Sequence, residues 1–147
     1  AFHITSPAED GSGAATAMLN ALKDGGVDPS DLTYINAHGT GTPMNDALET
    51  QAIKLALGEE KAKASFVSST KSMTGHMLGA AGAIEALACI MALKENILPP
   101  TINLNEPDEK CDLNYIPNKS LNSDITLALS NSLGFGGHNA CLAFRKA

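Results

Sequence analysis

The sequence predicts a layered α/β domain, and three observations support this prediction. Apolar runs typical of strands alternate with segments of helical periodicity along most of the 147 residues. Hydrophobic residues make up 44% of the chain and charged residues 18%, a balance typical of one compact globular domain. Aromatic residues make up only 4% and Trp is absent, so we expect a core of aliphatic and small side chains.

The first part of the chain predicts a strand, a helix and a second strand. Residues 2–5 resemble the tail of a strand. Residues 12–23 carry apolar side chains at helical spacing, and a pair of glycines follows them. A turn at 28–31 leads into an apolar strand at 32–36.

The middle of the chain predicts two helices with a strand between them. The helix at 46–57 begins with Asp46 and has Glu49 three residues on, which resembles a capping box. A strand follows at 64–68. The segment 75–96 predicts a long helix, whose many Gly and Ala residues indicate that it is buried between layers.

The last part of the chain predicts short extended segments. Residues 101–104 and 114–116 flank an acidic loop, and 125–129 and 140–144 are apolar runs typical of strands. The connection at 130–139 is too long for a tight hairpin turn. Its three glycines allow the backbone to approach a ligand or a catalytic centre.

Composition argues against several classes of function. The net charge of −6 and the absence of a basic run argue against a nucleic-acid partner. The long helix contains Glu85 and many small residues, so we expect no membrane span, and without a signal peptide we expect a cytoplasmic protein. The three cysteines have no metal-like spacing, and we expect reduced, non-catalytic thiols at Cys89, Cys111 and Cys141.

Two polar segments that follow predicted strands carry the candidate chemistry. Residues 36–42 contain His38, and residues 68–76 contain His76 with Lys71 five positions before it. Histidine exchanges protons near neutral pH, and a nearby ammonium group favours developing negative charge. We therefore expect the two segments to form two walls of one catalytic cleft.

Each of these features has a simpler interpretation. His38 could bond a loop carbonyl and His76 could cap a helix, but their shared context with Lys71 favours catalysis. The Gly/Thr run at 39–42 could cradle a phosphate. No Gly-Lys-Ser/Thr end follows it, which argues against a nucleotide loop.

Four segments together resemble the β-ketoacyl-[acyl carrier protein] synthases, a group of thiolase-like condensing enzymes. They are residues 36–43, 69–76, 99–103 and 131–139, and the nearest type is the elongating synthase II. The resemblance implies a layered thiolase-like fold, of which residues 1–147 would be the C-terminal half, with a mixed sheet and a buried Gly/Ala-rich helix. The family's nucleophilic Cys lies in an N-terminal half, which we expect to be absent here, so this chain alone should be inactive.

The resemblance also implies roles for individual residues. His38 and His76 would contact the malonyl thioester carbonyl and stabilise the enolate, and Lys71 would tune the surroundings of His76. Phe135 would gate the acyl tunnel and offer its backbone N–H to the oxyanion. Thr40 and Thr42, with Thr5, would bind the pantetheine arm.

A third set of residues matches a cluster that holds a structural cation in some relatives. Its members carry oxygen ligands, which suit a hard monovalent ion, although a buried hydrogen-bond network explains them as well: Asn36, Glu85, Ser130 and Asn131. No organic cofactor is implied beyond the phosphopantetheine of the carrier protein. The sequence departs from the family pattern at Asn45, where a Gly usually precedes the Asp.

The activity implied for the complete enzyme is the decarboxylative Claisen condensation of malonyl-[acyl carrier protein] with an acyl-enzyme thioester. The implied partners are acyl carrier protein, the absent N-terminal half and a second copy in a homodimer. Two alternatives remain open, a polyketide-type ketosynthase and a non-catalytic domain that binds carrier protein or dimerises with a true synthase. The joint presence of His38, Lys71, His76 and Phe135 argues against the second alternative.

Overall fold

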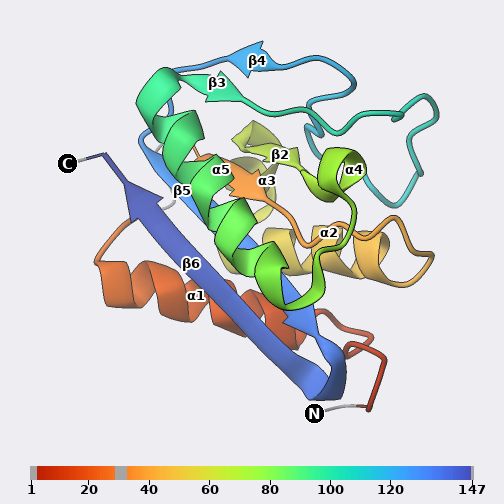
Figure 1. The fold of residues 1–147 in the computed structure, drawn as a ribbon. Helices are drawn as coiled ribbons and strands as arrows, with labels where there is room; N and C mark the ends of the chain where they lie inside the picture. Colours follow the sequence, from red (N-terminus) through yellow and green to blue (C-terminus); the bar gives the residue numbers. More distant parts are fainter. Residues whose placement is uncertain (1–2, 29–32, 147) are drawn as a thin grey trace.

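Helices cover both faces of a four-stranded sheet in the computed structural model, which describes residues 3–28 and 33–146 (Figure 1). The strand order in this sheet is β2-β1-β5-β6. β1 (Thr33–Asn36) runs parallel to both of its neighbours, β2 (Phe66–Ser68) and β5 (Leu127–Gly134). β6 (His138–Arg145) lies antiparallel to β5, so the predicted α/β class with a mixed sheet is confirmed.

Successive side chains along the strands point to opposite faces of the sheet, so the core has two parts, one on each face. Ile35 and Leu129 point to one face, where they join the core formed by the first two helices, and Tyr34 and Ala128 point to the other. The helices are α1 (Ser12–Gly25), α2 (Asn45–Leu57) and the short α3 (Glu59–Ala64) on the first face, and α5 (Ala81–Glu95) on the second. The buried hydrophobic side chains are mostly aliphatic or small, as the composition indicates, and Tyr34 is the largest fully buried side chain.

Several predicted boundaries hold and others do not. The helix predicted at 12–23 is α1, and the described part of the strand predicted at 32–36 is β1. Residues 29–32, which include most of the predicted turn, and residue 2 lie outside the described part of the chain. Residues 3–5 form a bend rather than a strand tail, and the strand predicted at 64–68 begins only at Phe66 because Ala64 ends α3. A small two-stranded sheet of β3 (Ile97–Leu98) and β4 (Leu121–Asn122) was not predicted.

The long helix predicted at 75–96 begins six residues later than expected. Lys71–Thr74 form one short helical turn, α4, and Leu78–Ala80 form a 3₁₀ turn, η1, before α5 starts at Ala81. Gly75 and Leu78 have φ angles of +71° and +51°, which a continuous α-helix does not contain. The His76 ring also accepts the Leu78 amide (3.1 Å), so that amide is not available to a helix.

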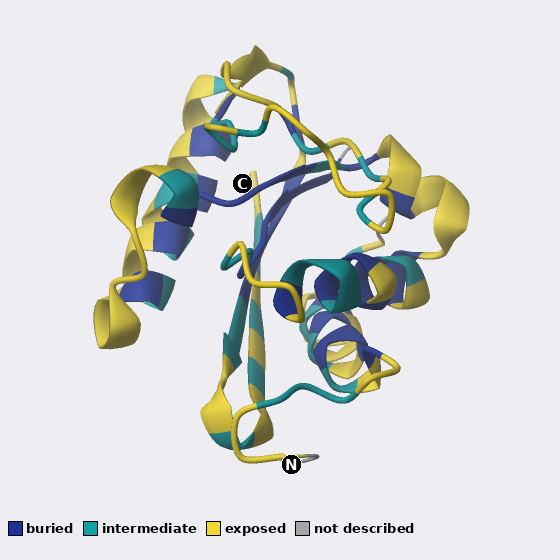
Figure 2. Ribbon diagram, turned by 90° about the vertical axis from the view of Figure 1, so that its right-hand side faces the viewer, coloured by how far each residue is buried: buried dark blue, intermediate teal, exposed yellow. Residues whose placement is uncertain are grey.

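The same helix is buried along one face only, which corrects the expectation that it lies between two layers of this chain. Figure 2 shows a buried inner stripe and an exposed outer stripe along α5. The inner stripe includes Glu85, Cys89 and Ala92, whereas Leu87 and Met91 on the outer stripe are exposed.

The connection predicted at 130–139 is a hairpin with a three-residue turn. β5 continues to Gly134, the 3₁₀ turn η2 spans Phe135–Gly137, and Gly134 pairs with His138 across the two strands. Gly136 and Gly137 have φ angles of +77° and +78°, which allow this short reversal. The polar side chains at 130–132 predict a loop, yet these residues continue the ladder of β5.

Candidate functional site

The parallel strands bring the two predicted histidine segments to the same edge of the sheet. Asn36 at the end of β1 is the register partner of both Ser68 on β2 and Ser130 on β5. The segments that carry His38 and His76 therefore leave the sheet at its carboxyl edge, where parallel α/β sheets place their ligands.

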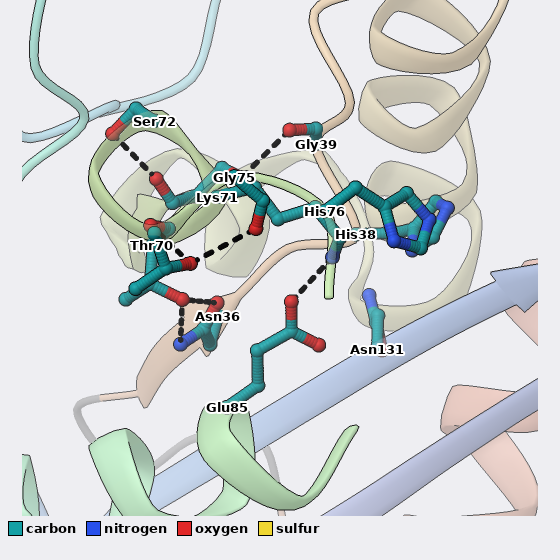
Figure 3. Close-up of polar contacts among 12 residues, drawn as sticks. Asn36, His38, Gly39, Thr70, Lys71, Ser72, Gly75, His76, Glu85 and Asn131 are labelled. Carbon is teal, nitrogen blue, oxygen red and sulfur yellow. Dashed lines mark hydrogen bonds and ion pairs between the residues drawn. The ribbon is translucent and has the colours of Figure 1, made fainter. Parts of the chain in front are cut away.

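The two histidine rings meet as predicted. Their centroids are 5.4 Å apart and their planes are at 85°, an edge-to-face arrangement (Figure 3). His38 is 8% exposed, whereas His76 is exposed to solvent. One ring is thus buried and the other faces solvent.

The surroundings of the rings determine their protonation. Burial, together with nearby Lys71 and His76, lowers the pKa of His38 to about 4, so His38 is neutral near pH 7. The Nδ1 atom of His76 accepts the Leu78 amide, which places the proton of its neutral form on Nε2. His76 can therefore donate an N–H bond from Nε2 without carrying a charge.

Lys71 lies beneath the histidine pair as a buried cation. Its Nζ atom donates to Glu85 Oε1 of α5, and the two side chains are 5% and 3% exposed (Figure 3). A buried ammonium is tolerated only with such a partner, because both charges have lost their hydration. The ion pair fixes the short helix α4 against α5 and places positive charge close to His38.

Close packing positions the backbone around His38. Gly39 has a φ angle of +39°, and its carbonyl accepts the Ser69 hydroxyl at 2.6 Å. A Cβ atom on Gly39 would lie 2.5 Å from the Cβ atom of Ser69, closer than real side chains approach. The segment after β1 is thus packed directly on the segment after β2.

Glu49 is a buried part of the site that the sequence analysis assigned to another role. Both of its oxygens accept loop amides, Oε1 from His38 N at 2.8 Å and Oε2 from Gly39 N at 2.9 Å. α2 has no side-chain cap, and its N-cap is Met44, so the predicted capping box is wrong. Glu49 lies on the helical face that also buries Ala52 and Ile53, and an acid on an apolar face was the signal that could have revealed it.

The amide of Asn45 also reaches this carboxylate. Its Nδ2 atom donates to Glu49 Oε2 at 3.2 Å and to Asp46 Oδ1 at 3.1 Å. The residue at which the sequence departs from the usual glycine therefore contacts the group that binds the His38 backbone.

The threonines predicted to bind pantetheine lie in two places. The hydroxyl oxygens of Thr40 and Thr42 are 2.9 Å apart on the loop after β1. Thr5 follows Ile4, whose carbonyl accepts the Gly136 amide at 2.7 Å, so the structure places Thr5 beside the hairpin turn.

Phe135 stands at the tip of the β5–β6 hairpin. Its side chain is 75% exposed and points largely to solvent. The hairpin is anchored by the Ile4–Gly136 hydrogen bond and by the strand ladder, which together hold the turn that carries Phe135.

The four predicted cation ligands come from β1, β5 and α5. Asn36 and Ser130 are register partners, and the amide nitrogen of Asn131 donates to Glu49 Oε1 at 3.2 Å. Glu85 Oε2 and Asn131 Oδ1 are buried without a hydrogen-bond partner among the described residues, as is the Nδ1 atom of His38. Two unpaired buried oxygens fit a cation, because such atoms are otherwise costly to bury. Within residues 3–28 and 33–146, no group of three or more His, Cys, Asp or Glu is placed to bind a metal.

The three cysteines are free and lie in surroundings that disfavour the thiolate. Burial raises the pKa of Cys89 to about 12 and that of Cys141 to about 12, and it also raises the pKa of Cys111. These thiols are therefore protonated near neutral pH. A cavity of about 670 Å³ lies between α1 and β6, and its lining includes none of the predicted site residues.

No helix in the described ranges has both the length and the apolar character that crossing a bilayer requires.

The sequence matches a known family model, described as the C-terminal domain of β-ketoacyl synthase, over residues 1–105. It is 58% identical over 146 residues to 3-oxoacyl-[acyl-carrier-protein] synthase 2 of Synechocystis sp. (strain ATCC 27184 / PCC 6803 / Kazusa). It is 53% identical to the protein of the same name from Staphylococcus aureus (strain COL). Each match covers 99% of this chain and 35% of the relative, so the chain spans about a third of the length of these relatives.

Solved structures share the fold as well. A type II PKS acyl-carrier protein in complex with its ketosynthase, AntDE:AntF, matches with a TM-score of 0.95 and 43% identity, covering 100% of this chain and 36% of the other. A β-ketoacyl synthase from Burkholderia phymatum STM815 matches with a TM-score of 0.89 and 40% identity, covering 99% of this chain and 34% of the other.

Proposed function

The chain belongs to the β-ketoacyl synthase family, whose C-terminal domain it matches over residues 1–105, and on this basis we propose that it is part of a fatty-acid elongating condensing enzyme. The observation that carries the proposal is the edge-to-face pair of His38 and His76 above the buried Lys71–Glu85 ion pair. The identity of 58% to a 3-oxoacyl-[acyl-carrier-protein] synthase 2 supports the choice of fatty-acid elongation.

The reaction is a decarboxylative Claisen condensation. An acyl group is held as a thioester on a cysteine outside this chain. The bond between the carboxylate and the methylene carbon of malonyl-[acyl carrier protein] breaks, carbon dioxide leaves, and the electron pair remains as an enolate. The enolate carbon attacks the acyl carbonyl, the bond to the cysteine sulfur breaks, and the β-ketoacyl product stays on the carrier.

His38 and His76 stabilise the charge that develops on the malonyl thioester oxygen. A neutral imidazole can donate an N–H bond to that oxygen, and the donor is strongest where water is excluded. The lowered pKa of His38 and the hydrogen bond at Nδ1 of His76 support this role for both rings. Lys71 adds a fixed positive charge that favours the enolate, and Glu85 holds it in place.

Other residues would bind the substrate around this centre. Thr40 and Thr42, with Thr5, offer hydroxyls to the pantetheine arm of the carrier. Phe135 gates access to the acyl site and offers its backbone N–H to the oxyanion, a role supported by its exposed side chain and by the positive φ angles of the two glycines that follow it.

A structural monovalent cation is part of the proposal. Asn36, Glu85, Ser130 and Asn131 would hold it, and the unpaired oxygens of Glu85 and Asn131 support this assignment. When bound, the cation would supply a positive charge next to these oxygens and would take no part in making or breaking bonds. No organic cofactor is required beyond the phosphopantetheine of the carrier.

The complete enzyme has further polypeptide packed on this chain. The outer stripe of α5 is apolar and exposed, and the relatives are about three times as long, so the remaining part of such an enzyme covers this stripe. We place the complete enzyme in the cytoplasm as a homodimer that receives acyl carrier protein. The free cysteines support a reducing compartment, and a solved neighbour is a ketosynthase in complex with its acyl-carrier protein.

A polyketide-type ketosynthase is the second candidate. The TM-score of 0.95 to a type II PKS ketosynthase, covering the whole chain, favours it, whereas the 43% identity is lower than the 58% to the fatty-acid relative. The two candidates share the condensation chemistry and differ in the acyl substrate.

The test is a chimera in which this chain replaces the matching C-terminal third of the Synechocystis synthase. We expect the chimera to form β-ketoacyl product from malonyl- and acyl-[acyl carrier protein], and the 147-residue chain alone to form none. A folded chimera without activity, or activity of the chain alone, would contradict the proposal. Activity on a growing polyketide rather than on saturated acyl chains would favour the second candidate.

The two histidines are tested in the same chimera. His38→Ala and His76→Ala should each slow malonyl decarboxylation by about 10²–10³-fold, because each removes one positioned donor. Loading of the acyl group on the cysteine should change far less. A variant that decarboxylates at the parental rate would show that its histidine is structural.

A further inference from the structure

The short helix α4, which carries Lys71 into the site, is a single turn of four residues. A helix of this length has little stability of its own, because isolated helices shorter than about 12 residues are marginal in water. On the side of the sheet, the Thr70 hydroxyl oxygen accepts the side-chain amide of Asn36 at 3.1 Å (Figure 3). The position of Lys71 therefore depends on contacts that reach α4 from other segments.

The segment 101–102 holds this turn by two reciprocal hydrogen bonds. Thr101 Oγ1 accepts the Ser69 amide at 3.0 Å, and Ser72 Oγ accepts the Ile102 amide at 3.0 Å. Each segment thus offers one side-chain hydroxyl to one backbone amide of the other. The Ser72 hydroxyl also donates to Ser69 O at 2.8 Å, which closes the turn around Lys71.

Thr101 is itself fixed by its backbone. Its amide donates to Ile116 O at 3.0 Å, and its carbonyl accepts the Asn118 amide at 2.8 Å. Pro99 and Pro100 precede it, and their rings restrict the backbone further. The turn at 69–72 is therefore attached to a part of the chain that is held on both sides.

We propose that Thr101 and Ser72 are positioning residues that hold Lys71 in the site. The inference rests on the proposed function, in which the Lys71 charge favours the enolate. The effect of a charge falls with its distance from the reacting atoms, so a shift of α4 would weaken it. The same turn leads through Gly75 to His76, so the two hydroxyls also act on the second histidine.

Substitution Thr101→Val tests the proposal in the active chimera. Val keeps the shape of Thr but removes the hydroxyl, and the buried Ser69 amide loses its acceptor. We expect kcat for malonyl decarboxylation per folded molecule to fall by about 10-fold, because small displacements of catalytic groups are costly. The KM for malonyl-[acyl carrier protein] should stay within about twofold, because no group that binds substrate is changed. Thr101→Ser keeps the hydroxyl and should restore the parental kcat to within about twofold.

The control is Thr126→Val, the same change at an exposed threonine, which should leave kcat and KM unchanged. A lower melting temperature with the parental kcat in folded Thr101→Val would show a purely structural role and overturn the proposal. A loss of kcat that Thr101→Ser does not restore would overturn it as well.

If Thr101→Val does not fold, Ser72→Ala replaces it. Ser72 is only half-buried, and its substitution removes the acceptor of the Ile102 amide while keeping the Thr101 bond. A fall in kcat at unchanged KM supports the proposal, and the parental kcat overturns it. The parent chimera tests the proposed function separately, since its activity is measured before any substitution.

Discussion

The two histidines of the site have different surroundings although their rings touch edge to face. His38 is buried and its Nδ1 atom has no partner among the described residues, whereas His76 is exposed and bonded to Leu78 N. The difference comes from the backbone: the segment after β1 is tied down by Glu49 and Ser69, while His76 follows Gly75 at φ +71°. Burial of the inner ring therefore makes the protonation of His38 respond to folding.

The lowered pKa of His38 makes stability depend on pH. The folded state has a His38 pKa of about 4 and the unfolded state one near 6.5, so the unfolded state binds more protons between these values. The contribution of His38 to the free energy of unfolding is complete above about pH 6.5. It is lost as the pH falls toward 4, and the total loss is roughly 3 kcal/mol. Urea unfolding of the unsubstituted chain and of His38→Gln is measured across this pH range. The contribution of His38 is the change with pH in the difference between their free energies of unfolding. Parallel curves would mean that His38 titrates near its ordinary pKa.

At the scale of elements, strand pairing and apolar packing are predictable, and boundaries set by tertiary contacts are not. The apolar periodicity of α1 and the apolar run of β1 predict both elements because their side chains enter the core. The predicted start of α5 and the predicted length of β5 are wrong, because His76 accepts a backbone amide at the helix start and because residues 130–132 continue the ladder with β6. The first contact joins nearby residues and the second is a strand pairing, and apolar periodicity predicts neither of them.

The same distinction applies to the site. The segments that contain His38 and His76 are motifs that each follow a strand, so they could be recognised from the sequence. Their contact at the edge of the sheet could also be predicted, because parallel strands end at the same edge. Glu49 lies on a helix where local spacing suggested a cap, and its true partners depend on how α2 packs under the loop.

The loop after β1 should tolerate substitution at one glycine and not at another. Gly39 and Gly41 both have positive φ angles, so an alanine costs about 1–2 kcal/mol of backbone strain at either position. Only at Gly39 does the new Cβ meet Ser69, and we expect at least about 1 kcal/mol of additional destabilisation there. Gly41→Ala is the matched control, since nothing lies within 4 Å of its Cβ. Equal free energies of unfolding for the two variants would contradict the close packing of the loops.

At the scale of the whole molecule, α5 has a face that this chain does not cover. Leu87 and Met91 are exposed on the outer stripe, and the chain spans 35% of the relatives it matches. The Gly/Ala-rich composition predicted a helix buried between layers, but residues 3–28 and 33–146 cover only one face of α5.

Leu87→Gln should affect the chimera more than the chain alone. Leu87 is 54% exposed here, so its replacement should change the stability of the chain by less than about 0.5 kcal/mol. In the chimera, where further polypeptide covers α5, the same change should cost about 2 kcal/mol or more and lower the melting temperature. Leu55→Gln on α2, at 55% exposure, is the control and should have little effect in either protein. Equal effects of the two changes in the chimera would show that the outer stripe of α5 stays exposed.

The parallel pairing of β1 with β5 decides the order in which the sheet can form. β1 and β2 are joined by a short stretch that contains α2 and α3, whereas about 90 residues separate β1 from its other partner, and pairs so distant in sequence form late. During synthesis, a chain that ends before Leu127 holds both histidine segments but leaves one edge of β1 open. An open edge of a buried strand pairs readily with other chains, so this nascent stage is where aggregation would begin. The arrival of β5 both closes that edge and delivers Asn131 to Glu49, which makes completion of the sheet and completion of the site a single event.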